Sequence, residues 1–262
     1  MTDSDYWGAT RAIVTAGASG IGLEIARALK AAGAQVWVCD IAEGPVAAAA
    51  AEGFAARICD VADMDAVTAF IDEAAAAMGG LDVMVNNAGI AGPAAPLHEQ
   101  DPEAWRRTFD VNVHGQFYTA RAAIPHLKAA AAAKGAASMI CMASVAGKYA
   151  FPLRSPYAAS KAAVIAMARS LSVELGPEQI RVNAIAPGVV AGDRIRRVFT
   201  DRAAMKGISY EEMEAIALKA VSMKTMVDPA EIAALVMYLA SPAGRPISGQ
   251  VMSICGGLEY TE

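Results

Sequence analysis

Short apolar runs, many of them rich in β-branched residues, alternate along the chain with longer amphipathic stretches. The runs with the length of buried strands are residues 12–15, 35–39, 55–59, 83–85, 138–142, 181–185 and 251–254. The stretches between them, such as 21–32 and 64–78, have the length and pattern of helices. Such alternation is typical of βαβ units, whose parallel strands lie between helices. The predicted fold class is therefore α/β, a single Rossmann-like doubly wound fold with a seven-stranded parallel sheet flanked by helices on both faces.

Composition narrows the class of function. The chain has 262 residues, of which 55% are hydrophobic, and no Pro/Ser-rich, charged or low-complexity linker divides it. Because this length can bury a large core, we predict a single domain over residues 1–262. The net charge of -5, with scattered Lys and Arg, provides no basic surface for nucleic acid or an anionic membrane. A small-molecule substrate is the remaining expectation.

The N-terminal residues 1–8 are polar and acidic, unlike a signal or transit peptide, and no run of about eighteen apolar residues predicts a membrane span. The four cysteines are far apart, which favours free thiols in a reducing compartment over disulfides. The three histidines lack carboxylates or thiols at metal-ligand spacing, so no metal is predicted. We expect a cytoplasmic protein.

Polar and Gly-rich residues follow six of the predicted strands. They are residues 17–22, Asp40, Asp60, residues 86–89, Ser144 and residues 187–188. Because the carboxyl ends of parallel strands meet at one edge of a sheet, a single crevice is expected to collect them. Asn, Asp and Gly are also default turn formers, so these residues count mainly through their shared position.

The turn at residues 15–22 joins a strand to a helix and has glycines at positions 17, 20 and 22. Backbone N–H groups in such a turn can approach a pyrophosphate, although a plain tight turn uses the same glycines. Asp40 lies eighteen residues after Gly22, near the ~20 expected for the acid that binds the adenosine ribose. Its charge repels a 2′-phosphate, and neither Ala18 nor Ile41 supplies a cation, so the sequence predicts NAD rather than NADP.

Tyr157 and Lys161 lie four residues apart, and Ser144 lies thirteen positions before Tyr157. Residues i and i+4 share one helix face, so the two side chains can be neighbours. A phenol ordinarily titrates near pH ~10, and an ammonium beside it favours the phenolate. The spacing therefore indicates an acid/base pair, although it also occurs in helices whose tyrosine packs on the core and whose lysine is solvated.

Taken together, these residues resemble the classical short-chain dehydrogenase/reductase family over essentially the whole chain. The matching elements, in family order and spacing, are residues 20–22, Asp60, residues 86–89, Asn112, Ser144, Tyr157, Lys161 and residues 187–188. The resemblance implies that Tyr157 is the general acid/base and that Lys161 promotes its ionisation and binds the nicotinamide ribose. It also implies that Ser144 binds the substrate oxygen and that Asn112 holds a water in a proton relay. The implied reaction is an NAD-dependent interconversion of a secondary alcohol and a ketone by hydride transfer.

The predicted cofactor-binding residues are Gly17, Ser19, Gly20, Ile21, Gly22, Asp40, Asp60, Val61, Asn87, Ala88, Gly89, Tyr157, Lys161, Pro187, Gly188 and Val190. Two positions depart from the family pattern. Ala16 stands where the family usually has the first glycine of its turn, a change we expect to be tolerated unless φ there is positive. Gly192 stands where a threonine often contacts the nicotinamide carboxamide, and the Val190 backbone or a neighbouring group would have to replace that contact.

Residues 189–226 lack strand character, and the family places its variable substrate lid here. The segment carries Arg194, Arg196, Arg197, Arg202 and Lys206. A charged run is usually a solvated face, but one of these arginines, or Arg154 just before Tyr157, could clamp an anionic group. Arg154 could instead pair with an acid across a subunit contact. The predicted substrate-binding residues are Ser144, Arg154, Tyr157 and Arg194, and the predicted substrate is a small polar or acidic hydroxy compound or a sugar.

The helix that carries Tyr157 also has small residues, Ala158, Ala159, Ala162, Ala163 and Ala166. Small residues permit close helix packing, and members of the family commonly form dimers and tetramers through this helix, so we expect a homotetramer.

Three other functions compete with the dehydrogenase. A sugar-nucleotide epimerase or dehydratase of the extended branch of the family uses the same Tyr/Lys pair, but it needs a larger C-terminal substrate domain than the residues after Pro187 provide. An enoyl reductase is disfavoured because its Tyr and Lys are usually more widely separated than here. The alternative from a different class is a catalytically silent dinucleotide-binding sensor or scaffold of the same fold. The complete set of Asn112, Ser144, Tyr157 and Lys161 argues against it, since a silent protein needs no activated phenol.

Overall fold

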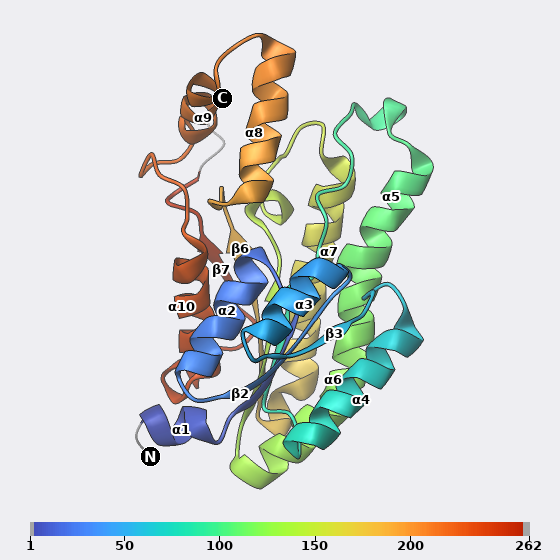
Figure 1. Ribbon diagram of the computed structural model, residues 1–262, viewed down its shortest axis with the longest axis vertical. Helices are drawn as coiled ribbons and strands as arrows, with labels where there is room; N and C mark the ends of the chain where they lie inside the picture. The colour runs from blue at the N-terminus through green and yellow to red at the C-terminus, as the bar shows by residue number, and fades with distance from the viewer. Residues whose placement is uncertain (1–2, 259–262) are drawn as a thin grey trace.

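The computed structural model describes residues 3–258, so the ends of the predicted domain at 1–2 and 259–262 lie outside the described residues. Its sheet consists of β1 (Arg11–Thr15), β2 (Gln35–Asp40), β3 (Ala55–Ile58), β4 (Val83–Asn86), β5 (Ala137–Met142), β6 (Ile180–Pro187) and β7 (Val251–Ile254). All neighbouring strands are parallel, in the order β3-β2-β1-β4-β5-β6-β7 (Figure 1). The predicted α/β fold class is confirmed, and each predicted strand lies within two residues of its observed bounds.

Helices cover both faces of the sheet. They are α1 (Asp3–Gly8), α2 (Gly20–Ala31), α3 (Glu43–Ala51), α4 (Met64–Met78), α5 (Pro102–Phe109), α6 (Gly115–Lys134), α7 (Ser155–Leu175), α8 (Asp193–Lys206), α9 (Tyr210–Leu218) and α10 (Pro229–Ala240). Helices α4, α6 and α7 pack on one face, and α2, α3 and α10 pack on the other. Helices α8 and α9 extend beyond the sheet at the top of Figure 1.

Local sequence signals explain where several helices begin and end. Asp63 precedes α4, and its carboxylate accepts hydrogen bonds from the N–H groups of Asp65 and Ala66, both at 3.0 Å. Gly79 ends the same helix in the left-handed conformation at φ 73°, which a glycine adopts without steric cost. Asp228 and Glu231 form a capping box at the start of α10. The Asp63 and Asp228 caps satisfy N–H groups that a helix leaves without partners at its N-terminus, whereas the Gly79 N–H donates to carbonyls of the last turn of α4.

The core consists of two apolar layers separated by the sheet. Every residue of β5 and β6 is buried, as expected of central parallel strands. Alternate residues of one strand face opposite layers: Met139 packs with Leu127 of α6, whereas Ile140 packs with Leu239 of α10. Each buried side chain of this size contributes about 1.5–3 kcal/mol to folding. The layers fix the strands whose carboxyl ends carry the predicted site residues.

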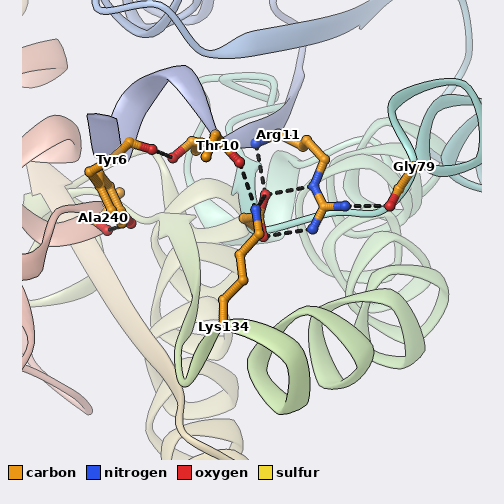
Figure 2. Close-up of polar contacts among 8 residues, drawn as sticks. Tyr6, Thr10, Arg11, Gly79, Lys134 and Ala240 are labelled. Atoms are coloured by element: carbon orange, nitrogen blue, oxygen red, sulfur yellow. Dashed lines mark hydrogen bonds and ion pairs between the residues drawn. The ribbon is translucent and has the colours of Figure 1, made fainter. Parts of the chain in front are cut away.

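A group of charges ties the amino ends of the central strands together (Figure 2). We call it the amino-edge cluster and define it as Arg11, Asp82 and Lys134. The buried Asp82 carboxylate accepts hydrogen bonds from Arg11 Nε at 2.7 Å, Arg11 Nη2 at 2.8 Å and Lys134 Nζ at 2.9 Å. Arg11 Nη1 donates to the Gly79 carbonyl and Lys134 Nζ to the Ala9 carbonyl. Burial acts to raise the pKa of Asp82, but the bonds from Arg11 and Lys134 outweigh it and hold the pKa below its usual value.

The cysteines are free, and Cys39, Cys59 and Cys141 are buried. Within residues 3–258, no helix has both the length and the apolar character needed to cross a membrane.

Candidate active site

A cavity of about 780 Å³ opens at the carboxyl edge of the sheet. The chain reverses its direction of travel across the sheet between β1 and β4, and doubly wound folds bind ligands at such switch points. The lining comes from the turns after β1, β4, β5 and β6 and from α7, α8 and α9. The predicted site residues that line it are Ser19, Gly20, Ile21, Asn87, Gly89, Ser144, Arg154, Tyr157, Lys161, Pro187, Gly188, Val190 and Arg194.

The remaining predicted residues do not line this cavity. They are Gly17, Gly22, Asp40, Asp60, Val61, Ala88 and Asn112. Ala88, Val61 and Asn112 are buried behind the lining. Asp40 ends β2 and Asp60 follows β3, on the side of the sheet where an adenosine would extend from the Gly-rich turn.

The Gly-rich turn leaves no room for side chains where the chain passes closest to itself. A Cβ added at Gly22 would lie 2.1 Å from the Ala16 carbonyl oxygen and 2.6 Å from Asn87 Nδ2. Asn87 Nδ2 donates to the carbonyls of Thr15 at 3.0 Å and Ala16 at 3.1 Å, which ties the turn to the loop after β4. Ser19 precedes α2 without a side-chain capping bond, so the first N–H groups of this helix remain available to a ligand. The turn therefore fits a dinucleotide pyrophosphate.

Both departures from the family pattern have backbone consequences. Ala16 has φ 47°, so the condition under which we expected a cost is met, and a left-handed alanine is strained by about 1–2 kcal/mol. Gly192 precedes α8 with φ 137° and ψ 179°, a conformation that is essentially restricted to glycine. A threonine at this position would be strained, so the contact expected from the family cannot be restored by substituting that residue alone.

Two carboxylates flank the Gly-rich turn. Asp40 accepts hydrogen bonds from the N–H of Ile41 at 2.8 Å and from Ser19 Oγ at 3.5 Å, and no cation among the described residues forms an ion pair with it. Asp60 forms an ion pair with Arg107 at 2.8 Å. Burial opposes ionisation of Asp60, but a backbone N–H and Arg107 outweigh it and lower its pKa. No local sequence signal predicts the partner Arg107, because it lies 47 positions from Asp60.

Tyr157 and Lys161 lie on one face of α7, as their spacing predicts. Lys161 Nζ lies 5.9 Å from the centre of the Tyr157 ring and donates to the Met142 carbonyl at 2.9 Å. Only 3% of Lys161 is exposed. Burial, followed by the positive charge of Arg194, lowers the pKa of Lys161 to about 7. Near neutral pH this lysine is therefore present as both amine and ammonium.

Ser144 and Asn112 are held by neighbouring backbone. Ser144 follows β5, and its Oγ accepts a hydrogen bond from the Ala146 N–H at 3.2 Å. Asn112 lies in the π-helical turn Asp110–His114, a geometry that recurs at functional sites. A Cβ added at Gly89 would lie 3.0 Å from Lys161 Nζ and 3.2 Å from Asn112 Oδ1, so both polar groups approach the same backbone.

Ser160 connects Asn112 to the helix of Tyr157. Asn112 Nδ2 donates to Ser160 Oγ at 2.9 Å, and Ser160 Oγ donates to the Tyr157 carbonyl at 2.8 Å. Asn112 also exchanges two hydrogen bonds with the Ile90 backbone, at 2.7 and 2.9 Å. Sequence reasoning missed Ser160. The available signal was a small polar residue directly before Lys161 in a helix with one buried face.

The part of the cavity lined by α8 and by the start of α7 is rich in arginine. Arg154, at the start of α7, donates from Nη1 to the Gly92 carbonyl at 3.1 Å, while its buried Nε has no partner. Helix α8 contributes Arg194, Arg197, Arg202 and Lys206 to the lining, but not Arg196. Phe199 of α8 packs in one apolar cluster with Met213 of α9, which holds the two helices together.

Known proteins share the sequence and the fold that form this site. A family model described as enoyl-(acyl carrier protein) reductase matches residues 15–259. Cis-4-hydroxycyclohexanecarboxylate dehydrogenase from Sinomonas cyclohexanicum is 36% identical over 251 residues, which cover 94% of this chain and 95% of that protein.

Two solved structures are similar over nearly the whole chain. A variant of actinorhodin polyketide ketoreductase with NADPH has a TM-score of 0.89 at 31% identity, covering 100% of both chains. NAD⁺-bound xylitol dehydrogenase has a TM-score of 0.86 at 26% identity, covering 95% of this chain and 98% of that one. The similarity thus includes the Gly-rich turn, the Tyr157 helix and the strands that position them. This chain belongs to the short-chain dehydrogenase/reductase family of nicotinamide-dependent oxidoreductases.

Proposed function

We propose that this protein is an NAD-dependent dehydrogenase that interconverts a secondary alcohol and a ketone, with Asn112, Ser144, Tyr157 and Lys161 as its catalytic site. The main observation in support of this proposal is that Ser144, Tyr157 and Lys161 line the same cavity as the Gly-rich turn. A nicotinamide dinucleotide supplies the hydride acceptor or donor when it is bound. The residues of the chain supply binding, orientation and proton transfer.

Each polar group has a separate task in this proposal. The Tyr157 phenol receives the alcohol proton in oxidation and returns it in reduction. The ammonium form of Lys161 favours ionisation of that phenol, since it lies on the same helix face. Ser144 Oγ donates a hydrogen bond to the substrate oxygen. Asn112 holds the relay water, and its bond to Ser160 keeps α7 aligned with the loop after β4.

The preference for NAD rests on Asp40. Its carboxylate ends β2 where the adenosine ribose is expected, and a 2′-phosphate placed beside it would meet a negative charge instead of a cation. The related structures were solved with NADPH in one case and NAD⁺ in the other, so the local charge decides our choice.

The substrate we propose is a small polar or acidic hydroxy compound or a sugar. The relatives are named for a hydroxycyclohexanecarboxylate and for xylitol, both of which carry secondary hydroxyl groups. The cavity provides both apolar wall, such as Phe199, and several arginines.

We also propose a homotetramer and a cytoplasmic location. Ala159, Ala162 and Ala166 are exposed along one stripe of α7, and Val173, 77% exposed, continues that stripe. Such a surface permits close packing of helices between subunits. Light scattering on the purified protein tests the tetramer, and a monomeric mass contradicts it.

The test of the activity is a screen for NADH absorbance with secondary alcohols, hydroxy acids, polyols and sugars, run in parallel with NADP. An enoyl thioester with NADH forms a separate arm. With the best alcohol, Tyr157→Phe should lower kcat by about a hundredfold to ten-thousandfold, the usual contribution of a general acid/base. Tyr238→Phe, an exposed tyrosine on α10 outside the cavity, is the matched control and should retain full activity.

Three outcomes contradict the proposal. Full activity of Tyr157→Phe removes the mechanism, and a higher kcat/KM with NADP than with NAD removes the assigned cofactor. NAD binding without turnover of any alcohol supports the catalytically silent sensor or scaffold instead.

A further inference from the structure

The cavity contains far more positive than negative charge. Its cationic lining residues are Arg154, Lys161, Arg194, Arg197, Arg202 and Lys206, whereas the only acidic residue in the described lining is Asp193. None of these cations forms an ion pair with a carboxylate of the described residues. Lys161 is buried and Arg154 and Arg202 are half-buried, whereas Arg194, Arg197 and Lys206 are exposed. Because charges withdrawn from water are normally paired, the three less exposed cations make this lining suited to an anionic ligand.

Arg154 is the fixed member of this group. Its side chain is half-buried at the start of α7, and Nη1 donates only to the backbone carbonyls of Ala91 and Gly92. Its Nε is buried and has no hydrogen-bond partner. A guanidinium with an unused, desolvated N–H edge is suited to bidentate binding of an oxyanion.

Two arginines of α8 share this region. Arg154, Arg194 and Arg202 all line the same cavity. Burial, and then the positive charges of Arg202 and Arg194, lower the pKa of Arg154. Arg194 also acts on the buried Lys161, which places it near the catalytic end of the cavity. The pyrophosphate fits the Gly-rich turn instead, where these arginines are not found.

We infer that Arg154, Arg194 and Arg202 form a subsite for an oxyanion of the substrate, a carboxylate, sulfonate or phosphate, so that the substrate is an anionic alcohol. The identity of the reacting alcohol group rests on the proposed function, whereas the binding of the anion does not. Because Arg154 belongs to the body of the fold and the other two belong to α8, the bound anion bridges them.

The first experiment measures binding without catalysis. Tyr157→Phe protein saturated with NAD, so that the pyrophosphate position is filled, is titrated with butyrate, propanesulfonate or inorganic phosphate. Thermal stability is followed at constant ionic strength, and sodium chloride and the neutral butyramide serve as controls. At least one of the three oxyanions should raise the melting temperature, whereas butyramide should not. The oxyanion that binds most tightly identifies the chemical class of the substrate's anionic group. Equal effects of butyrate and butyramide, or no effect of any oxyanion, overturn the subsite.

Substitutions assign the effect to the subsite. In the same Tyr157→Phe background, Arg154→Gln should weaken anion binding by about tenfold to a hundredfold, the range for a lost hydrogen bond to a charged group. Arg202→Gln provides a second test should Arg154→Gln fail to fold. Arg196→Gln removes an exposed cation from the same helix but outside the cavity lining, and should bind as tightly as its parent. Similar losses for Arg196→Gln and Arg154→Gln contradict the inference.

Turnover separates this inference from the proposed function. An active hydroxy acid should lose kcat/KM by the same factor in Arg154→Gln, while its neutral amide should be affected little. Saturable anion binding without NADH formation leaves the subsite intact and contradicts the dehydrogenase. NADH formation from neutral alcohols at least as efficiently as from their acidic counterparts leaves the dehydrogenase intact and contradicts the subsite.

Discussion

Two groups of cations lie at opposite edges of the same sheet, and they differ in whether a carboxylate pairs with them. In the amino-edge cluster, Arg11 and Lys134 both bind the buried carboxylate of Asp82, and their remaining bonds go to backbone carbonyls. At the carboxyl edge, Lys161 donates to one carbonyl, and Arg154 retains a buried N–H without a partner.

The difference separates charges that join elements of the fold from charges that form no ion pair with a described carboxylate. The amino-edge cluster connects β1, the residue before β4 and the end of α6, so its pairing adds to stability. The cavity leaves positive charge desolvated and unpaired, which costs free energy in the free protein. Functional sites commonly carry such strain because a bound ligand relieves it.

The largest effect on stability is expected at the amino edge. Asp82→Asn should lower the free energy of unfolding by about 3 kcal/mol, because it leaves the largely buried Arg11 without its counter-charge. Urea denaturation measures this change. Glu73→Gln, which breaks the exposed pair with Arg57, is the control and should cost less than about 1 kcal/mol.

The stabilisation by Asp82 should also depend on pH. The folded-state pKa of Asp82 is depressed, so its stabilisation is complete above the unfolded value near ~4 and is lost as pH falls through the folded value. The difference between wild type and Asp82→Asn should therefore shrink in acid. A difference that persists below both pKa values would show that packing, and not charge, is responsible.

A pH-dependent effect of the same sign, but in a higher pH range, is expected at the carboxyl edge. Lys161→Met removes a lysine whose pKa is lowered from 10.5 to about 7, so the folded wild type binds fewer protons than the unfolded chain between these values. Wild-type stability should therefore rise relative to the variant by about 1.4 kcal/mol per pH unit, or about 2 kcal/mol between pH 7.5 and 9. Parallel denaturation series at several pH values measure the slope. Parallel curves for the two proteins would contradict the desolvated lysine.

The smallest expected effect concerns backbone strain beside the cavity. Ala16→Gly should raise the free energy of unfolding by about 0.5–1 kcal/mol, since glycine adopts φ 47° without strain but loses more conformational entropy on folding. Thermal denaturation measures the gain. Ala18→Gly, in the same turn but without a positive φ, provides the comparison and should not stabilise the protein. A loss of stability in Ala16→Gly would show that the left-handed alanine is not strained.

The sequence was sufficient wherever a signal is local or periodic. The alternation of short apolar runs with longer amphipathic stretches predicted every strand, because a central parallel strand is buried on both faces whereas a covering helix buries one face. The spacing of Tyr157 and Lys161 placed both on one face of α7 for the same reason. The position of Asp40 at a strand end followed from parallel topology.

Only the tertiary structure decided which distant groups meet. Asn112 reaches Ser160 across 48 positions, and Arg11 reaches Asp82 across 71, distances over which the sequence carries no periodic signal. The φ angle of Ala16 depends on how the turn packs against Asn87, and the composition of the turn did not reveal it. The sequence alone thus predicted that Tyr157, Lys161 and the Gly-rich turn share one edge of a parallel sheet. Packing decided which cations pair with a carboxylate and which line the cavity without an ion pair among the described residues, because charge pairing depends on three-dimensional proximity and burial.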